Sequence, residues 1–395
     1  MSRRPTLLTP AFLAILAATL AYFVSVGMTL PLFPLFVKGP LAGGAVAIGV
    51  AAGMFSVAAI LVRPFVGRFG DRRGRRLLIA GGAALAGISV AGYAIAESLP
   101  VLIGMRVLGG IGEAAFFTGA ATAAADLAPD ERRGEAVSYF SLGLYVGIAI
   151  GPLLGELLVG DDHFARVWLV AGAGMLIAGA LGLRVPDTRP EPTGEEGRLI
   201  HPAALAPGIV IWASVWGFAA YETFVPLHAR DVGLSGARYV FLMYASLIVL
   251  VRLFGARIPD AWGSKRTATV SLGSTAIGLG LMAAWDTIAG LYVGTAILAL
   301  GQSLAFPALM TMAVSRAPAS QRAAVVGTFT AFVDLGFGIG PVSAGLAVRL
   351  VDANLGAFLA GAAAAVVGLA VLRTRRDAAP GSAPSPPAAV PEVEG

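Results

Sequence analysis

The stretch Gly67–Arg76 reads GRFGDRRGRR and holds five arginines, one aspartate and three glycines between two long apolar runs. It stands in a chain of 395 residues that is 57% hydrophobic and only 13% charged. Charges are costly inside a membrane, so a chain this apolar has to gather them where water reaches. The stretch therefore predicts an exposed turn between two membrane-spanning helices.

Apolar runs of about 20 residues recur along the whole chain, and a helix of that length crosses the hydrocarbon core of a bilayer. The mean hydropathy is +0.81. The first run continues through Val37, which is too long for a signal peptide, so it is interpreted as a membrane helix. Twelve spans are predicted, at 10–36, 44–66, 77–97, 99–126, 136–159, 164–184, 203–228, 237–258, 267–285, 287–315, 322–349 and 354–372. The fold class is an all-α integral membrane protein.

The basic residues predict the orientation, because cytoplasmic loops carry an excess of Lys and Arg. With the N-terminus inside, 20 of the 28 basic residues fall in cytoplasmic segments, five fall outside and three lie within spans. Both termini are therefore expected in the cytoplasm. The expected location is the plasma membrane, as a multi-pass protein of the bacterial inner membrane. Sorting of positive charge also explains the pI of about 9.8, so no nucleic-acid partner is expected.

The chain contains two copies of one unit of six spans. LVRPFVGRFGDRRGRR from Leu61 and LVRLFGARIPDAWGSKR from Leu250 are related by a constant offset, which carries Leu61 onto Leu250. The same offset pairs Arg63 with Arg252, and Gly151-Pro152 with Gly340-Pro341. An offset held over about ninety residues indicates an internal duplication, and an even number of spans gives both copies the same topology.

The duplication predicts the domain organisation. Residues 1–184 form an N-terminal six-helix bundle and residues 202–373 a C-terminal one. Residues 185–201 are rich in Pro, Glu, Arg and Gly and are expected to form a cytoplasmic linker. Residues 374–395 are rich in Ala, Pro and Ser and are expected to be a disordered cytoplasmic tail.

The opening stretch, the twelve spans and the repeat together resemble the major facilitator superfamily. The residues that match its loop after the second helix are Gly67, Asp71, Arg72, Gly74, Arg75 and Arg76. In that family the loop holds the two halves together on the cytoplasmic side while the outer side is open, so these residues are expected to form a cytoplasmic gate. The resemblance implies that Asp71 faces the start of the eleventh helix. It also implies that a basic residue pairs with an acid that ends the fourth helix, here Asp126.

The fifth helix carries a second motif, GxxxGxxxGPxxG. It consists of Gly143, Gly147, Gly151, Pro152 and Gly155. Glycines four apart let another helix approach closely, and proline loosens the helix. Ordinary small-residue packing would also explain the bare glycines. The full run resembles the antiporter signature of the superfamily, which implies drug/proton exchange, and the sugar-porter signature PESPR is absent after the sixth helix.

Four intramembrane charges are candidates for proton coupling or substrate binding. Arg106 resembles the fourth-helix arginine of the superfamily, which is associated with proton coupling. Glu113 lies two turns further on nearly the same face, so a switching pair and a static bridge are both open. Glu222 is near several aromatic residues and would suit a lipophilic cation, unless it is an interfacial residue. Asp334 is expected near mid-depth, as a functional acid or a packing hydrogen bond.

Other classes of site find no support in the sequence. The chain has no cysteine and three scattered histidines, so neither a metal site nor a redox site is expected. No nucleotide-binding GxxxxGK[ST] motif is present, so a gradient rather than ATP is expected to drive transport. The chain is not expected to be an enzyme or to need a cofactor.

Together these observations predict a secondary active transporter that exports small amphiphilic or drug-like compounds in exchange for protons, by alternating access. An exporter of one metabolite, such as a sugar, is an alternative within transport. A non-transporting membrane sensor or scaffold is an alternative of another class. The expected partners are the lipid bilayer, a small-molecule substrate and protons, and a monomer is expected to function.

Overall fold

The computed structural model describes residues 7–129, 132–160, 163–188, 200–255, 261–315 and 322–374. The predicted tail beyond Thr374 and most of the predicted linker lie outside these residues. Every regular element in the described residues is helical. Eleven of the helices are long and apolar enough to cross a membrane, and α9 occupies the place of the eighth predicted span.

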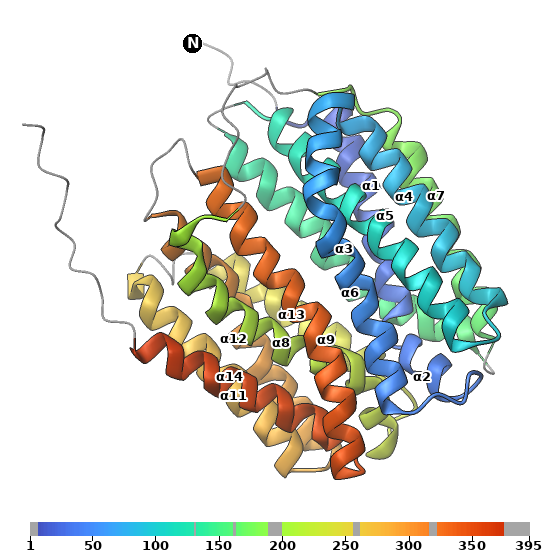
Figure 1. The fold of residues 1–395 in the computed structure, drawn as a ribbon, viewed down its shortest axis with the longest axis vertical. Coiled ribbons are helices and arrows are strands. Elements are labelled where there is room, and N and C mark those ends of the chain that lie inside the picture. The colour runs from blue at the N-terminus through green and yellow to red at the C-terminus, as the bar shows by residue number, and fades with distance from the viewer. Residues whose placement is uncertain are drawn as a thin grey trace, which may run out of the picture.

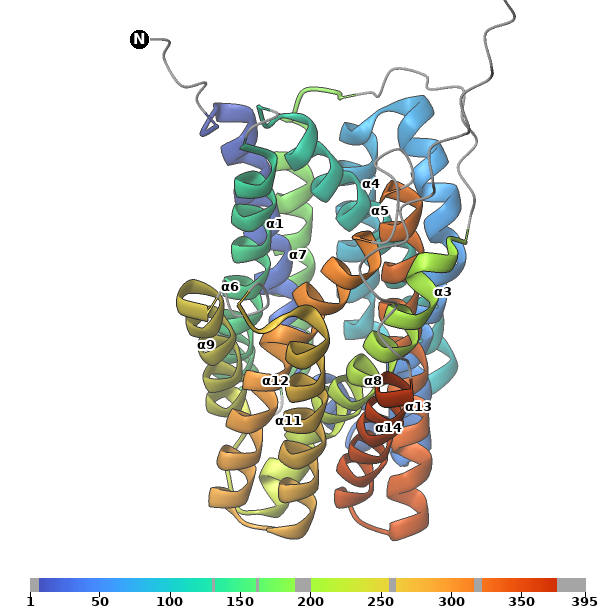
Figure 2. The same ribbon diagram turned by 90° about the vertical axis from the view of Figure 1, so that its left-hand side faces the viewer.

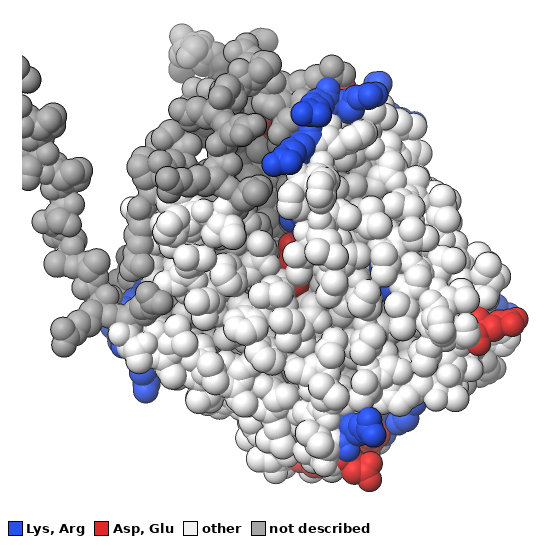
Figure 3. Space-filling model, in the orientation of Figure 1, with Lys and Arg blue, Asp and Glu red and all other residues white. Residues whose placement is uncertain are grey.

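The helices form two bundles, one from each half of the chain (Figures 1 and 2). The first bundle comprises α1 (Pro10–Thr29), α2 (Phe33–Lys38), α3 (Ala45–Arg73), α4 (Arg75–Gly92), the 3-10 turn η1 (Tyr93–Ile95), α5 (Leu99–Asp126), α6 (Arg133–Val159) and α7 (Phe164–Gly182). The second comprises α8 (Pro202–Asp231), α9 (Arg238–Gly255), α11 (Ser264–Ala284), α12 (Ile288–Val314), α13 (Arg322–Val351) and α14 (Leu355–Thr374). On the face shown in Figure 3, most charged side chains lie toward the two ends of the molecule, and the surface between them is largely uncharged.

The internal repeat is visible in where the helices begin. The equivalent pairs α4 and α11, α5 and α12, and α6 and α13 all start at the same offset that relates Leu61 to Leu250. Gly74 and Gly263 are related by this offset too, and both have a positive φ, of 92° and 79°. Each glycine stands directly before a helix, where a residue with a Cβ would be strained. The sequence offset therefore corresponds to the same local structure in both halves.

The exposed turn predicted at Gly67–Arg76 is much shorter than expected. Helix α3 continues through Arg73, and the chain turns only at Gly74. Arginine is a good helix former, and positive charge in the last turn stabilises a helix through its dipole. The arginines thus extend α3 beyond its apolar part, and the left-handed glycine ends it.

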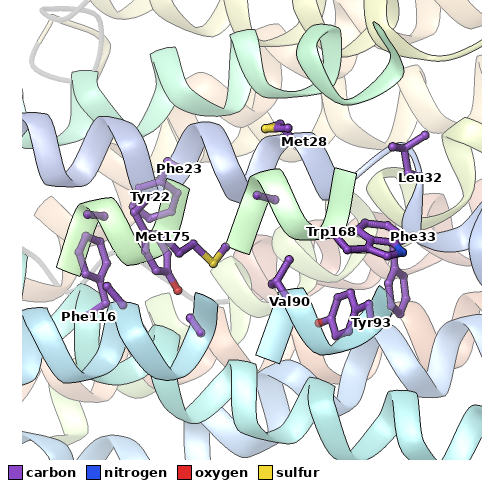
Figure 4. Close-up of a cluster of buried hydrophobic side chains, with 14 of the residues drawn as sticks. Tyr22, Phe23, Met28, Leu32, Phe33, Val90, Tyr93, Phe116, Trp168 and Met175 are labelled. Atoms are coloured by element: carbon purple, nitrogen blue, oxygen red, sulfur yellow. The ribbon is translucent and has the colours of Figure 1, made fainter. Parts of the chain in front are cut away.

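The predicted glycine motif of the fifth span packs α6 against α1 within the first bundle. A Cβ at Gly147, Gly151 or Gly155 would collide with the α1 backbone between Phe23 and Met28. Gly143 has more room, since its nearest α1 atom would be 3.6 Å away. The interior beside α1 is filled by aromatic and sulfur-containing side chains, among them Tyr22, which stacks on Phe116 at 3.9 Å (Figure 4).

The two bundles meet along α3 with α13 and along α6 with α9, which are equivalent pairs in the repeat. The linker end is defined here as the end of the bundles at which Gly74 lies, and the other end is the opposite end. Near the opposite end, a Cβ at Gly49 or Gly53 of α3 would collide with the α13 backbone at Pro341 or Gly338. Here α6 also reaches across, since Glu156 accepts a hydrogen bond from the Ala237 amide at 2.7 Å.

The buried core follows the same division. The core of the first bundle continues into the second through Ala220, Phe224 and Leu227 of α8 and Ala344 and Val348 of α13, all in the halves of these helices toward the opposite end. The core near the linker end of the second bundle, around Leu309 and Phe329, contains only residues of that bundle. Among the described residues, the bundles are thus joined at the opposite end and separate toward the linker end.

This contact predicts a different response to two matched glycine substitutions. Gly53→Leu should lower stability by about 1–3 kcal/mol, because overpacking forces α3 away from α13. Gly81→Leu on α4 is the control, since a Cβ there meets no atom within 4 Å. Thermal unfolding of the purified protein in detergent measures both. Equal stability of the two variants would contradict the close packing of α3 on α13.

Candidate functional site

A cavity of about 510 Å³ lies between the two bundles. Both bundles contribute to its wall, which is mostly apolar and rich in Phe and Tyr side chains. Its charged lining residues are Arg63, Arg106, Glu113, Glu222, Arg252 and Asp334. All four candidates for coupling or substrate binding therefore line one cavity, together with two arginines that were not selected.

Arg63 joins the two bundles through an ion pair. From α3 it contacts Asp334 of α13, with Nε 2.8 Å from Oδ2 and Nη2 donating to Oδ1 at 3.0 Å. The same Nη2 lies 3.7 Å from Oε2 of Glu113 on α5. Two carboxylates thus share one guanidinium, and the shorter contact crosses between the bundles.

Arg106 does not form the close pair with Glu113 that the sequence suggested. Its guanidinium donates to the carbonyl oxygens of Ala51 and Ala52 on α3, each at 3.0 Å. It also lies between the rings of Phe33 and Phe55, with centroid distances of 4.4 and 4.6 Å. The fourth-helix arginine is therefore held by backbone and aromatic groups, and the cation beside Glu113 is Arg63.

Glu222 lies on α8, and it lines the cavity rather than the rim of the membrane. Arg106 lines the same cavity. Of the aromatic neighbours expected from the sequence, Phe218 shares the cavity wall. Tyr221 and Phe224 are instead buried in the helix packing, and Trp216 donates from Nε1 to the hydroxyl of Ser343 on α13. Glu222 therefore shares the cavity with only some of these aromatic residues.

Arg252 of α9 reaches across to the first bundle as Arg63 reaches to the second. Its Nη2 donates to the Tyr145 hydroxyl of α6 at 2.6 Å, and its guanidinium carbon lies 4.2 Å from the centre of that ring. The offset of the repeat relates Tyr145 to Asp334, just as it relates Arg63 to Arg252. The two contacts are therefore equivalent in the repeat, with a carboxylate in one and a phenol in the other.

The linker end carries the residues of the predicted cytoplasmic gate. Arg75 lies with Nε 3.8 Å from Oδ2 of Asp126, the acid that ends α5, as the resemblance implied. Asp126 also accepts a hydrogen bond from Thr188 at 2.9 Å, and Asp187 accepts one from the Arg76 amide at 3.4 Å. The start of the linker thus lies directly against the gate.

The remaining gate residues take less part in these contacts. Gly67 is in open surroundings on α3, and Arg72 is exposed. A Cβ at Gly74 would collide with the Asp187 carboxylate, so this position needs glycine for both space and conformation. The side chain of Asp71 lies outside the described part of the structure, and its expected contact with the eleventh helix stays a prediction.

Of the four side chains in these two arginine contacts, the sequence selected only Asp334 as a candidate. Arg63 and Arg252 were noted as equivalent residues of the repeat, and Tyr145 was not selected. Gln302 and Tyr93 also line the cavity. An arginine within an apolar span is itself a signal, because it has to find a partner or a polar cavity. In the described residues, no group of three or more His, Asp or Glu side chains is placed to hold a metal.

These features define a multi-pass helical membrane transporter with a charged cavity between two repeated bundles. The chain matches the model of the Major Facilitator Superfamily over residues 15–278 and 214–394, and it belongs to this family. It is 31% identical over 367 residues to an uncharacterized MFS-type transporter of Salmonella typhimurium, covering 90% of this chain and 94% of that one. An uncharacterized MFS-type transporter of Burkholderia mallei is 26% identical over 377 residues, covering 92% and 91%.

Solved structures share the fold at low sequence identity. A peptide transporter in complex with alafosfalin gives a TM-score of 0.77 at 14% identity, covering 92% of this chain and 93% of that one. A bacterial homologue of the human lysosomal transporter Spinster, in an inward-facing and occupied conformation, gives 0.74 at 16% identity, covering 92% and 94%. At such low identities, the TM-scores show a shared fold alone.

The Arg63–Asp334 pair predicts a non-additive pair of substitutions. Breaking a fully buried ion pair costs about 3–5 kcal/mol of stability. Arg63→Gln or Asp334→Asn alone should destabilise the protein by less than this, because water reaches part of both side chains, which are 22% and 16% exposed. The double variant should cost less than the sum of the two, because it leaves neither of the two charges behind. Thermal unfolding of the four proteins measures this coupling. Strict additivity would contradict a direct interaction between the two residues.

Proposed function

We propose that the chain exports small amphiphilic or drug-like compounds in exchange for protons, by alternating access of the central cavity to the two sides of the membrane. The observation that carries this proposal is the cluster of Arg63, Asp334 and Glu113. It combines two titratable acids, a contact between the bundles and a position on the cavity wall. Uptake of a proton by an acid of this cluster would therefore change a contact at the interface between the two bundles, which moves during alternating access.

The coupling follows from the electrostatics of an apolar site. Burial favours the neutral form of a carboxyl, whereas a neighbouring guanidinium favours its charged form. A proton on Asp334 would remove most of its attraction to Arg63 and weaken the contact between α3 and α13. Loss of the proton would restore that contact. Protonation and the relative position of the bundles are then linked, as exchange requires.

Glu113 is a second proton carrier in this proposal, and Arg63 takes the role at its side that the sequence gave to Arg106. Arg106 and Glu222 form the other charged group of the cavity and would bind polar parts of the substrate. The apolar wall supports an amphiphilic substrate, because such sites bind mainly through hydrophobic area with a few placed polar groups. The glycine motif of α6 would serve exchange by allowing α1 and α6 to pack closely.

The orientation of the protein belongs to the same proposal. The excess of arginine at the linker end supports a cytoplasmic linker and cytoplasmic termini in a bacterial inner membrane. The cavity would then face the cytoplasm in this conformation, with the opposite end closed by Gly49, Gly53 and Glu156. The contact of Arg75 with Asp126 would act as part of the cytoplasmic gate.

Transport by purified protein in proteoliposomes tests the proposal. The substrates are three fluorescent amphiphiles of similar size, one cationic, one neutral and one anionic, measured with and without an imposed pH gradient. The wild type should move at least one of them faster under the gradient. Asp334→Asn and Glu113→Gln should abolish this acceleration, whereas Glu97→Gln, which changes an exposed acid near a loop, should retain it.

Two results would contradict the proposal. Acceleration that survives in both Asp334→Asn and Glu113→Gln would move the proton site elsewhere. A wild type that moves none of the three compounds under any gradient would favour the exporter of a single metabolite.

A further inference from the structure

The two halves of the repeat place an arginine at the same point of the interface between the bundles, and only one of these arginines meets an acid. Arg63 contacts Asp334, as described above, through two of its nitrogens. Its equivalent Arg252 contacts Tyr145, a neutral group, through one nitrogen. In the first half of the repeat, the arginine at this position therefore binds a carboxylate.

The charge of Arg252 is not balanced by the protein around it. Among the described residues, no Asp or Glu lies within ion-pair distance of its guanidinium, and its buried Nε donates no hydrogen bond. The ring of Tyr145 offsets part of the charge through a cation–π contact. A guanidinium next to an apolar cavity still retains unused donors in a planar fork, which matches the two oxygens of a carboxylate.

The other two arginines of the cavity are held by more hydrogen bonds or ion pairs than Arg252. Arg63 pairs with Asp334 and lies near Glu113, and the Arg106 guanidinium donates to the carbonyl oxygens of Ala51 and Ala52. Tyr244, on the same helix as Arg252, lines the same cavity. A molecule that enters the cavity therefore meets Arg252 as a cation whose guanidinium is held by one phenol hydroxyl and still has an unused buried donor.

We propose that Arg252 and Tyr145 form a subsite for the carboxylate of an amphiphilic organic acid. The carboxylate would accept hydrogen bonds from the Arg252 guanidinium, in the manner of Asp334 with Arg63, and from the Tyr145 hydroxyl. The apolar part of the substrate would lie against Phe218 and Phe337, which line the same cavity. This inference rests on the proposed function, and it narrows the class of substrate from amphiphiles in general to carboxylic acids.

Equilibrium binding of a matched set of probes to the full-length protein in detergent tests the subsite. The probes are a dansyl-labelled medium-chain carboxylic acid, its neutral primary amide and the corresponding amine, followed by fluorescence anisotropy. The wild type should bind the acid most tightly. Arg252→Gln should weaken binding of the acid on the order of tenfold to a hundredfold, the effect of losing hydrogen bonds between charged groups, and leave the amide nearly unchanged.

Two further variants make the test specific. Tyr145→Asp places an aspartate at the position equivalent to Asp334 in the repeat. The new carboxylate should pair with Arg252 and weaken binding of the acid, whereas the amide should still bind. Arg166→Gln removes an exposed arginine of α7 and should change nothing. Retained binding of the amide shows in each case that the variant is folded.

Equal affinity of the wild type for acid, amide and amine would overturn the subsite, as would an equal loss of all three probes in Arg252→Gln. No gradient is present in this assay, so its result is independent of proton coupling. Selective binding of the acid without transport driven by a pH gradient would leave the subsite standing and reject proton exchange. Gradient-driven transport without selective binding would do the reverse.

Discussion

The arrangement of this transporter depends on the ion pair between Arg63 and Asp334, because charged groups within a membrane span have to be paired or reach water. The pair places each charge beside one of opposite sign, and it also forms a contact between the bundles. Glu113 adds a second acid to the same guanidinium at 3.7 Å. One arginine therefore connects two carboxyl groups to the interface of α3 and α13. The close glycine contacts of that interface lie toward the opposite end, so the pair lies where the bundles begin to separate.

The duplication gives the two halves equivalent helices and equivalent contacts between the bundles, but the side chains at these contacts differ. Both halves place an arginine opposite the other bundle, on α3 and on α9. The first meets a carboxylate, which can gain and lose a proton, and the second meets a phenol, which ordinarily stays protonated at neutral pH. We infer that the two sites have separated their tasks, with proton coupling at Asp334 and recognition of an acidic substrate at Arg252.

Much of the fold could be predicted from the sequence, because the length of an apolar run and the offset of a repeat are properties of single segments. The helix starts at Arg75 and Ser264 follow that offset. The end of α3 was predicted wrongly, since the arginines after Gly67 extend the helix instead of forming a turn. The partners of the charged side chains could not be predicted from the sequence either. Arg106 and Glu113 are close in sequence and on nearly one face, yet Glu113 shares Arg63, which lies far back in the sequence on another helix. Such pairing depends on how helices pack, which a uniformly apolar sequence does not specify.

The most direct test of the central claim is the distance between the bundles at the linker end, as a function of pH. The chain has no cysteine, so spin labels can be placed at Leu77→Cys on α4 and Val270→Cys on α11 without removing a native thiol. Pulsed electron paramagnetic resonance should show longer distances at high pH, because the charged Arg63–Asp334 pair then stabilises the present conformation, in which the linker end is open. The distances should be shorter at low pH, because loss of the pair allows the linker end to close. Adding Asp334→Asn should give the shorter distances at every pH, and adding Glu97→Gln should follow the wild type. Distances that ignore both pH and Asp334→Asn would contradict a lock between Arg63 and Asp334.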